Sequence, residues 1–308
     1  LRMAAPHDER GRGEPAQGLP PSLRAADDST LDSRPLFVPN MHGAGKGQVL
    51  HLPPRTTRRA VTNWPGDVFD RLILPDRSVR IWLPPGYDSR DTSTRYPTLY
   101  VHDGQNMMDM ELSWTNRCWD LGSTLTRLLD AGDIEVAPIV IMVDNCVENP
   151  MTANPLIRRR WLEYSDTPIG ERYLEYLADE LKPLVDENFH TNPAPEFTSS
   201  MGSSMGGLVS FLAVLRRPDV FRNCLCLSPA FQVPLITEVA VSGWRVLKGL
   251  GEGEEAPSPA RTPARIYLDN GGDTDESKVP LIDLFDGMNP GYFWLDTSLQ
   301  AGVDAVMG

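Results

Sequence analysis

The segment with the clearest chemical potential is Gly202-Ser203-Ser204-Met205-Gly206, which has the spacing Gly-x-Ser-x-Gly. In this pattern the central serine occupies a sharp strand-to-helix turn that exposes its hydroxyl, and the glycines relieve crowding there. A strand is predicted over 196–203, directly before the motif. A helix is predicted directly after it, ending near residue 217 because residue 218 is proline. This context predicts that Ser204 is a nucleophile for acyl transfer.

Acyl transfer also requires N–H groups directed at the oxyanion that develops in the transition state. We expect the first from Met205, the residue after the nucleophile. The second is expected from the loop 102–106, where Gly104 lets backbone approach a substrate and Gln105 offers its N–H. The alternative interpretation of this loop is a tight turn with no catalytic role.

The elements that would position these residues alternate along the chain. Nearly unbroken apolar runs predict buried parallel strands at 98–101 and 139–143, with a helix at 121–129 between them. Further strands are predicted at 224–227, which includes Cys224 and Cys226, and at 266–268. Alternating strands and helices indicate an α/β fold with a doubly wound, mostly parallel sheet flanked by helices.

Two further segments carry predictions that the structure can test. Leu72–Leu74 and Val79–Leu83 flank a turn-forming segment and suggest a hairpin. Apolar residues at helical spacing predict a helix over 169–185, which Pro183 should bend or divide.

The first 62 residues differ in composition from the rest of the chain. They are rich in Arg, Pro, Gly, Asp and Ser and have few periodic apolar positions. Such a segment buries too little apolar surface to offset chain entropy, so we expect a disordered leader over 1–62 and one domain over 63–308. Residues 251–263, rich in Glu and Pro, are expected to be a surface insertion.

Bulk properties exclude several classes of protein. A net charge of −13 argues against a nucleic-acid partner. No apolar stretch reaches the ~18 residues of a membrane span, and residues 1–34 contain no signal-peptide core. A cytoplasmic location is the default expectation, with a targeting segment upstream of Leu1 as the alternative. The four cysteines form no metal motif, and we expect neither a metal nor a cofactor.

Taken together, the motifs resemble one family. It is the putative-esterase branch of the α/β hydrolases, which includes enterochelin esterases, esterase D (S-formylglutathione hydrolase) and feruloyl esterase domains. The resemblance covers about residues 66–307. Its motifs are Gly-Ser-Ser-Met-Gly-Gly at 202–207, Leu-Pro-Pro-Gly-Tyr-Asp at 83–88, Tyr-Pro-Thr-Leu-Tyr-Val-His-Asp-Gly-Gln-Asn at 96–106, Glu163-Tyr164-Ser165, Leu-Ser-Pro-Ala-Phe at 227–231 and Tyr-Leu-Asp-Asn-Gly at 267–271.

The resemblance implies a catalytic acid in the loop after the strand at 266–268. Asp275 is the first choice because it lies three residues after a glycine, as the acid does in the family, and Asp273 is the runner-up. A solvated acidic loop is the alternative. The family also places segments similar to Arg158-Arg159-Arg160 at the mouth of the site, although surface charges are the favoured interpretation here.

A serine nucleophile needs a base, which in this family is a histidine that follows the acid after one further strand. The histidines of this chain are His7, His42, His51, His102 and His190. His190 precedes the strand that ends at the motif, so it should lie at the wrong end of that strand. His102 is the possible substitute base, against a structural role beside the loop. The last strand and helix of the family's fold are therefore expected to be missing from this chain.

These observations lead to three hypotheses. The first is a carboxylic ester hydrolase with a small-molecule ester substrate and an acyl-serine on Ser204, impaired by the missing histidine. The second is an acyltransferase on the same scaffold. The third is a catalytically inactive fragment or binding protein.

Overall fold

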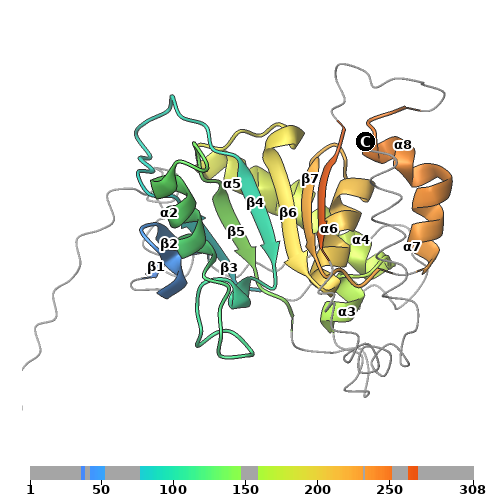
Figure 1. Cartoon of the computed structure of the whole chain (residues 1–308), viewed down its shortest axis with the longest axis horizontal. Helices are drawn as coiled ribbons and strands as arrows, with labels where there is room; N and C mark the ends of the chain where they lie inside the picture. Colours follow the sequence, from blue (N-terminus) through green and yellow to red (C-terminus); the bar gives the residue numbers. More distant parts are fainter. Residues whose placement is uncertain are drawn as a thin grey trace, which may run out of the picture.

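The computed structural model describes residues 36–38, 42–52, 77–146, 159–231, 233–251 and 263–269. Within these residues eight strands form one mixed sheet with helices on both faces (Figure 1). In chain order the strands are Leu36–Val38 (β1), Gln48–Leu52 (β2), Val79–Leu83 (β3), Thr98–His102 (β4), Ile139–Val143 (β5), Thr198–Ser203 (β6), Asn223–Leu227 (β7) and Arg265–Asp269 (β8).

Along the chain, the α-helices follow and separate the parallel strands. The α-helices are Leu121–Ala131 (α2), Arg159–Glu163 (α3), Pro168–Glu175 (α4), Lys182–Asn188 (α5), Met205–Arg216 (α6), Val233–Glu238 (α7) and Trp244–Leu247 (α8). Short 3-10 turns occupy His42–Ala44 (η2), Gly104–Asn106 (η4) and Pro195–Phe197 (η6), and π-helical turns occupy Tyr176–Leu181 (η5) and Val239–Gly243 (η7). Among the described residues, no helix has the length and apolar character needed to cross a membrane.

The order of the strands in the sheet is β1-β2-β3-β5-β4-β6-β7-β8. The pairs β1–β2, β2–β3 and β3–β5 are antiparallel, whereas β5, β4, β6, β7 and β8 are parallel neighbours. The carboxyl ends of the five parallel strands therefore meet at one edge of the sheet. This is the edge at which polar residues from different strands can converge.

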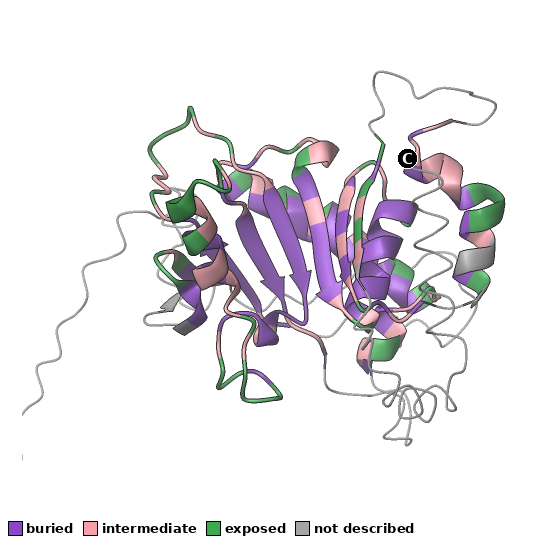
Figure 2. Ribbon diagram, viewed as in Figure 1, coloured by how far each residue is buried: buried purple, intermediate pink, exposed green. Residues whose placement is uncertain are grey.

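Each face of the sheet has its own apolar core, because alternate residues of a strand point to opposite faces. On β4, Leu99 and Val101 belong to the core that includes Leu125 of α2. Tyr100 belongs to the other core, which includes Phe211 of α6. The central strands β3, β4 and β5 are buried along their whole length (Figure 2).

The prediction of a disordered leader over 1–62 is wrong for residues 36–38 and 48–52, which form β1 and β2 of the sheet. In β2, Val49, Leu50 and Leu52 are buried, and the strand pairs antiparallel with β3 from Gln48↔Leu83 to Leu52↔Val79. The apolar run here is short, so the surrounding Pro, Gly and Arg residues concealed it. The folded domain therefore begins before residue 63.

The predicted hairpin partner of Val79–Leu83 is different in the structure. This strand, β3, lies between β2 and β5. Residues 72–74 lie outside the described part of the chain. Local spacing suggested the nearest apolar segment as a partner, but pairing between distant strands decided the register.

The remaining described elements agree closely with the sequence patterns. The helix predicted over 169–185 is divided into α4, η5 and α5, with Pro183 in the first turn of α5. Proline lacks an N–H and clashes with the carbonyl four residues earlier, and a π-helical turn accommodates that defect. Cys224 and Cys226 are buried on β7, as predicted. Of the predicted insertion 251–263, residues 252–262 lie outside the described chain.

Candidate active site

Ser204 occupies the turn between β6 and α6, at the carboxyl edge of the sheet. Its backbone has φ 58° and ψ −121°, and the residue is exposed. Its N–H donates to the Leu227 carbonyl at 2.9 Å, and its carbonyl accepts from the N–H groups of Leu208 at 3.1 Å and Ala230 at 3.0 Å. A positive φ in a residue other than glycine is a strained conformation that surrounding contacts must hold. These backbone contacts hold Ser204 at the carboxyl edge of the sheet.

The two glycines of the motif let the strand and the helix meet closely at this corner. A Cβ on Gly202 would lie 2.6 Å from the backbone carbonyl group of Gly206. A Cβ on Gly206 would lie 3.3 Å from Asp103 Oδ2 and 3.5 Å from His102 Cβ. The second glycine thus places the start of α6 directly against the end of β4.

The loop after β4 turns sharply at Asp103, which has φ 55° and ψ 44°, and continues as η4. A Cβ on Gly104 would lie 2.6 Å from the backbone of Met142 and Val143, so only glycine fits against β5. The first N–H groups of a helical turn have no partner within that turn. Gly104 and Gln105 open η4, and Met205 opens α6. The close approach of Gly206 to Asp103 shows that these two segments are neighbours.

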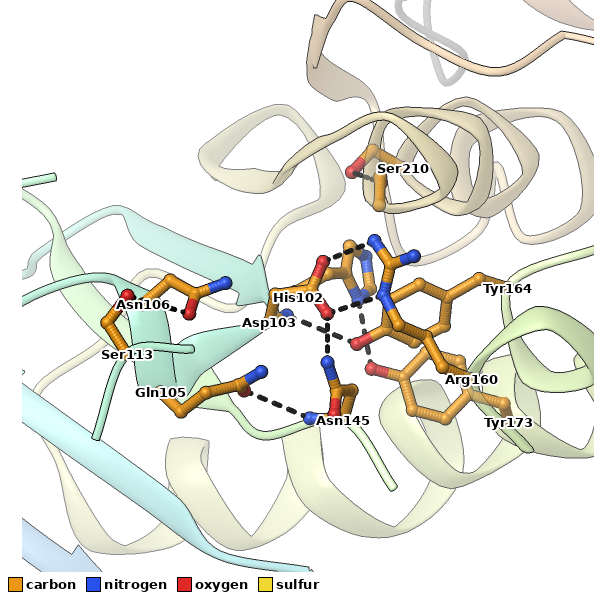
Figure 3. Close-up of polar contacts among 11 residues, drawn as sticks. His102, Asp103, Gln105, Asn106, Ser113, Asn145, Arg160, Tyr164, Tyr173 and Ser210 are labelled. Atoms are coloured by element: carbon orange, nitrogen blue, oxygen red, sulfur yellow. Dashed lines mark hydrogen bonds and ion pairs between the residues drawn. The ribbon is translucent and has the colours of Figure 1, made fainter. Parts of the chain in front are cut away.

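Asp103 holds this loop through four hydrogen bonds (Figure 3). Arg160 donates from Nε to Oδ1 and from Nη2 to Oδ2, both at 2.7 Å. Asn145 donates from Nδ2 to Oδ1 at 2.6 Å, and the Asp103 N–H donates to the Tyr164 hydroxyl at 3.1 Å. The Gln105 side chain is also fixed, since its Oε1 accepts from the Asn145 N–H at 3.2 Å. Side chains from β4, the end of β5 and α3 therefore converge on one loop.

The favoured interpretation of Arg158–Arg160 as surface charges is wrong for two of the three residues. The Arg159 side chain is 1% exposed and donates from Nε to Glu163 Oε1 at 2.9 Å. The Arg160 side chain is 20% exposed and is bound to Asp103. A run of three arginines resembles a solvated face in sequence, but acidic partners on distant segments make burial of a guanidinium possible. Arg158 lies outside the described residues.

A group of buried ion pairs centres on Glu163, which lies on the same helix as Arg160. Arg77 forms two hydrogen bonds with Glu163, at 3.1 and 3.0 Å, and both side chains are almost fully buried. The Arg77 guanidinium also lies 5.0 Å from the centre of the Tyr173 ring. Glu163 thus joins α3 to the segment that leads into β3.

His102 is not placed to act as the substitute base. It is fully buried, and its Nδ1 lies 2.9 Å from the Tyr173 hydroxyl (Figure 3). Its Nε2 lies 3.0 Å from the Ser200 hydroxyl. Burial lowers the pKa of His102 to about 3. Both ring nitrogens are therefore occupied away from Ser204, and the geometry favours the structural role.

The other described histidines lie on three separate segments. The His190 carbonyl accepts from the N–H of Tyr96, which precedes β4, at 2.8 Å, so His190 lies at the amino edge of the sheet as predicted. His51 is on β2, and His42 begins η2. His7 lies outside the described residues.

Asp275 and Asp273 also lie outside the described residues. The strand that precedes them, β8, runs parallel to β7, and Leu227 pairs with Asp269 at the carboxyl edge. The chain therefore leaves β8 at the edge where Ser204 lies.

Three groups that shape this site were not predicted from the sequence: Asn145, Arg77 and Tyr173. The polar pair Asp144-Asn145 directly after the buried strand β5 was a usable signal, because residues at the carboxyl ends of parallel strands converge. Asp144 pairs with Arg80, and burial raises the pKa of the Asp144 carboxyl to about 6 despite that cation. The contacts of Arg77 and Tyr173 depend on segments far apart in sequence and left no local pattern.

The described strands and helices, with a strand-Ser-helix corner at the carboxyl edge of a mostly parallel sheet, form an α/β-hydrolase fold. A family model described as "Putative esterase" matches residues 73–288, and the chain belongs to that family.

Two curated relatives match about half of the chain. The "Uncharacterized protein YbbA" of Bacillus subtilis is 26% identical over 148 residues, which is 47% of this chain and 54% of that protein. An "Endo-1,4-beta-xylanase/feruloyl esterase" of Xylanibacter ruminicola is 27% identical over 147 residues, which is 47% of this chain and 18% of that protein. The chain thus spans less than two thirds of either relative.

Similar solved structures include a ferulic acid esterase and the enterochelin esterase from Shigella flexneri. For the ferulic acid esterase the TM-score is 0.41 at 18% identity, and the matched region covers 60% of this chain and 58% of that chain. For the enterochelin esterase the TM-score is 0.42 at 18% identity, and the matched region covers 61% of this chain and 41% of that chain.

Proposed function

We propose that this chain is a carboxylic ester hydrolase that acts on a small-molecule ester through an acyl-serine on Ser204. The observation that carries the proposal is the exposed, positive-φ Ser204 beside a glycine loop. Family membership supports the reaction class. The exposure of a serine in a strained turn points to a role other than packing.

In the proposed reaction, Ser204 Oγ forms a bond to the ester carbonyl carbon, and its proton passes through a base to the departing alcohol. Water then attacks the acyl-serine, releases the acid and returns the proton to the serine. The oxyanion would accept hydrogen bonds from the N–H groups of Met205 and of Gly104 or Gln105. Asp275, or Asp273 in its place, would orient the base.

The base is the element that this sequence does not supply in the expected position. No histidine follows His190 among the 308 residues. His102 is engaged with Tyr173 and Ser200. We therefore expect weak esterase activity from this chain, of the size that an oxyanion hole and substrate binding provide alone, about 10³–10⁴-fold over water.

A covalent probe tests this proposal without requiring turnover. The 308-residue chain is treated with a fluorophosphonate in the presence and absence of imidazole, and the adduct is located by peptide mass spectrometry. We expect slow phosphonylation at Ser204 that imidazole accelerates, because a diffusible base replaces the missing one.

The matched control for Ser204→Ala is Ser203→Ala, since Ser203 is the adjacent last residue of β6. Ser204→Ala should abolish the adduct and Ser203→Ala should retain it. Adducts on another residue would refute the assignment of the nucleophile. Fast phosphonylation without imidazole would show that this chain already contains a base.

A second measurement tests the weak turnover itself. Hydrolysis of p-nitrophenyl acetate is compared between this chain and its Ser204→Ala variant, with and without added imidazole. The wild-type chain should be slow alone and should gain more from imidazole than the variant does. Equal rates of the two proteins would contradict turnover at Ser204.

A further inference from the structure

The loop that would bind the oxyanion is held by a charged clamp, which consists of Asp103 in the loop and its partners Arg160 and Asn145 outside it. Asp103 adopts a left-handed conformation, which disfavours any residue with a Cβ, and it begins η4 without capping that turn through its side chain. Its carboxylate is directed to Arg160 and Asn145 instead. The conformation of the loop therefore depends on partners that lie 42 and 57 residues further along the chain.

Arg160 is suited to fix this position. Its two parallel N–H···O contacts with Asp103 are both 2.7 Å, and such bidentate pairs impose direction as well as attraction. Its guanidinium carbon also lies 5.1 Å from the centre of the Tyr164 ring, whose hydroxyl accepts the Asp103 N–H. Burial acts to lower the pKa of Arg160, but the bonds to Asp103 outweigh it and the pKa is raised, so the charge persists.

The charge of Arg160 matters as much as its shape. Asp103 Oδ2 lies 3.3 Å from where a Cβ of Gly206 would be, so this carboxylate adjoins the corner that carries Ser204. An unpaired carboxylate here would repel the negative charge that develops on the substrate oxygen in acyl transfer. Paired with Arg160, it holds the loop without adding a net negative charge.

We propose that Arg160 is a positioning residue for the reaction at Ser204: it fixes the loop through Asp103 and neutralises that carboxylate beside the developing oxyanion. The inference rests on the proposed function, because it concerns the same acylation step. Arg160 acts through Asp103 and does not contact the reacting atoms.

The test uses the phosphonylation assay with imidazole held constant. The limiting rate of phosphonylation and the probe concentration at half-maximal rate are measured for wild type and for Arg160→Met, Arg160→Lys and Asp103→Asn/Arg160→Met. Arg160→Met should lower the limiting rate about 10- to 100-fold, at or below the size of losing one oxyanion donor, with little change in the half-saturating concentration. Arg160→Lys should recover part of the rate because it keeps the charge and loses the fork.

The double variant separates charge from simple loss of structure. Asp103→Asn/Arg160→Met should react faster than Arg160→Met, because it removes the unpaired carboxylate. Glu163→Gln is the matched control, since it disturbs the neighbouring ion pairs and leaves the Asp103–Arg160 pair intact. A double variant that is slower than Arg160→Met, or Arg160→Met at the wild-type rate, would overturn the inference.

Hydrogen exchange makes failure of this inference distinguishable from failure of the proposed function. In Arg160→Met, peptides that contain residues 103–107 should exchange faster than in wild type. If wild-type Ser204 forms no adduct, the proposed function fails, and the exchange measurement still tests whether Arg160 holds the loop. Unchanged exchange in these peptides would overturn the clamp independently of any chemistry.

Discussion

At the scale of single residues, the corner at Ser204 depends on how closely two glycines approach. Gly202 ends the buried part of β6, and its α-carbon faces the backbone of Gly206 in the first turn of α6. The hydroxyl of Ser204 is exposed because the chain reverses over this contact. Space for a side chain at Gly202 would exist only if the helix moved away from the strand.

The first prediction compares the two glycines. Gly202→Ala should lower the free energy of unfolding by about 1–3 kcal/mol, because its Cβ would meet backbone at 2.6 Å. Gly206→Ala should stay near wild type, since its nearest contact is 3.3 Å and alanine favours the helix by about 1 kcal/mol. Urea unfolding followed by circular dichroism measures both. Equal losses would contradict the close packing at Gly202.

At the scale of elements, α4 is capped at its start by Thr167 and contacts the end of β4 through Tyr173. Thr167 begins the helix by accepting a hydrogen bond from the Gly170 N–H at 3.1 Å, and its hydroxyl donates to the Leu162 carbonyl at 2.7 Å. The same helix carries Tyr173, whose hydroxyl bonds His102. The start of α4 thus helps to fix the position of a side chain beneath the site.

The second prediction concerns this cap. Thr167→Ala should lower the free energy of unfolding by about 1 kcal/mol, because the Gly170 N–H loses its acceptor. Thr167→Ser should recover most of that loss, since serine keeps the hydroxyl. Thermal unfolding of the three proteins measures the order. A serine variant as unstable as the alanine variant would show that the methyl group, and not the cap, matters.

At the scale of the whole molecule, buried ionisable groups make stability depend on pH in two opposing ways. His102 has a folded pKa of about 3, below its ordinary 6.5, so its contribution is complete above pH 6.5 and is lost as the pH falls. Asp144 has a folded pKa of about 6, above its ordinary 3.8, so its contribution is complete at low pH and is lost as the pH rises. The two effects partly cancel between pH 4 and 6.5.

The third prediction separates them. Between pH 6.5 and pH 5, His102 should cost the native state about 2 kcal/mol, and Asp144 should return about 1 kcal/mol. His102→Gln should therefore lose less stability on acidification than wild type, and Asp144→Asn should lose more. Urea midpoints at pH 6.5, 5.7 and 5.0 measure the slopes. Parallel slopes for wild type and His102→Gln would show that His102 does not titrate between the two states.

The alternating elements of the sheet and the corner at Ser204 follow from local patterns in the sequence. Apolar runs and helical spacing are local, and the Gly-x-Ser-x-Gly spacing imposes its own backbone geometry. The same local reasoning failed for β1 and β2, because a short strand in a polar segment is stabilised by its neighbour and not by its own composition.

The groups that surround this corner are brought together by contacts between distant segments of the fold. Arg160 and Asp103 are separated by 57 residues, and Arg77 and Glu163 by 86, so no spacing in the sequence joins them. The strand order brings β4, β5 and β6 side by side, and α3 places Arg160 against the loop after β4. Burial of a charged side chain is costly without a partner, and for Arg77 and Arg159 the fold supplies that partner in Glu163.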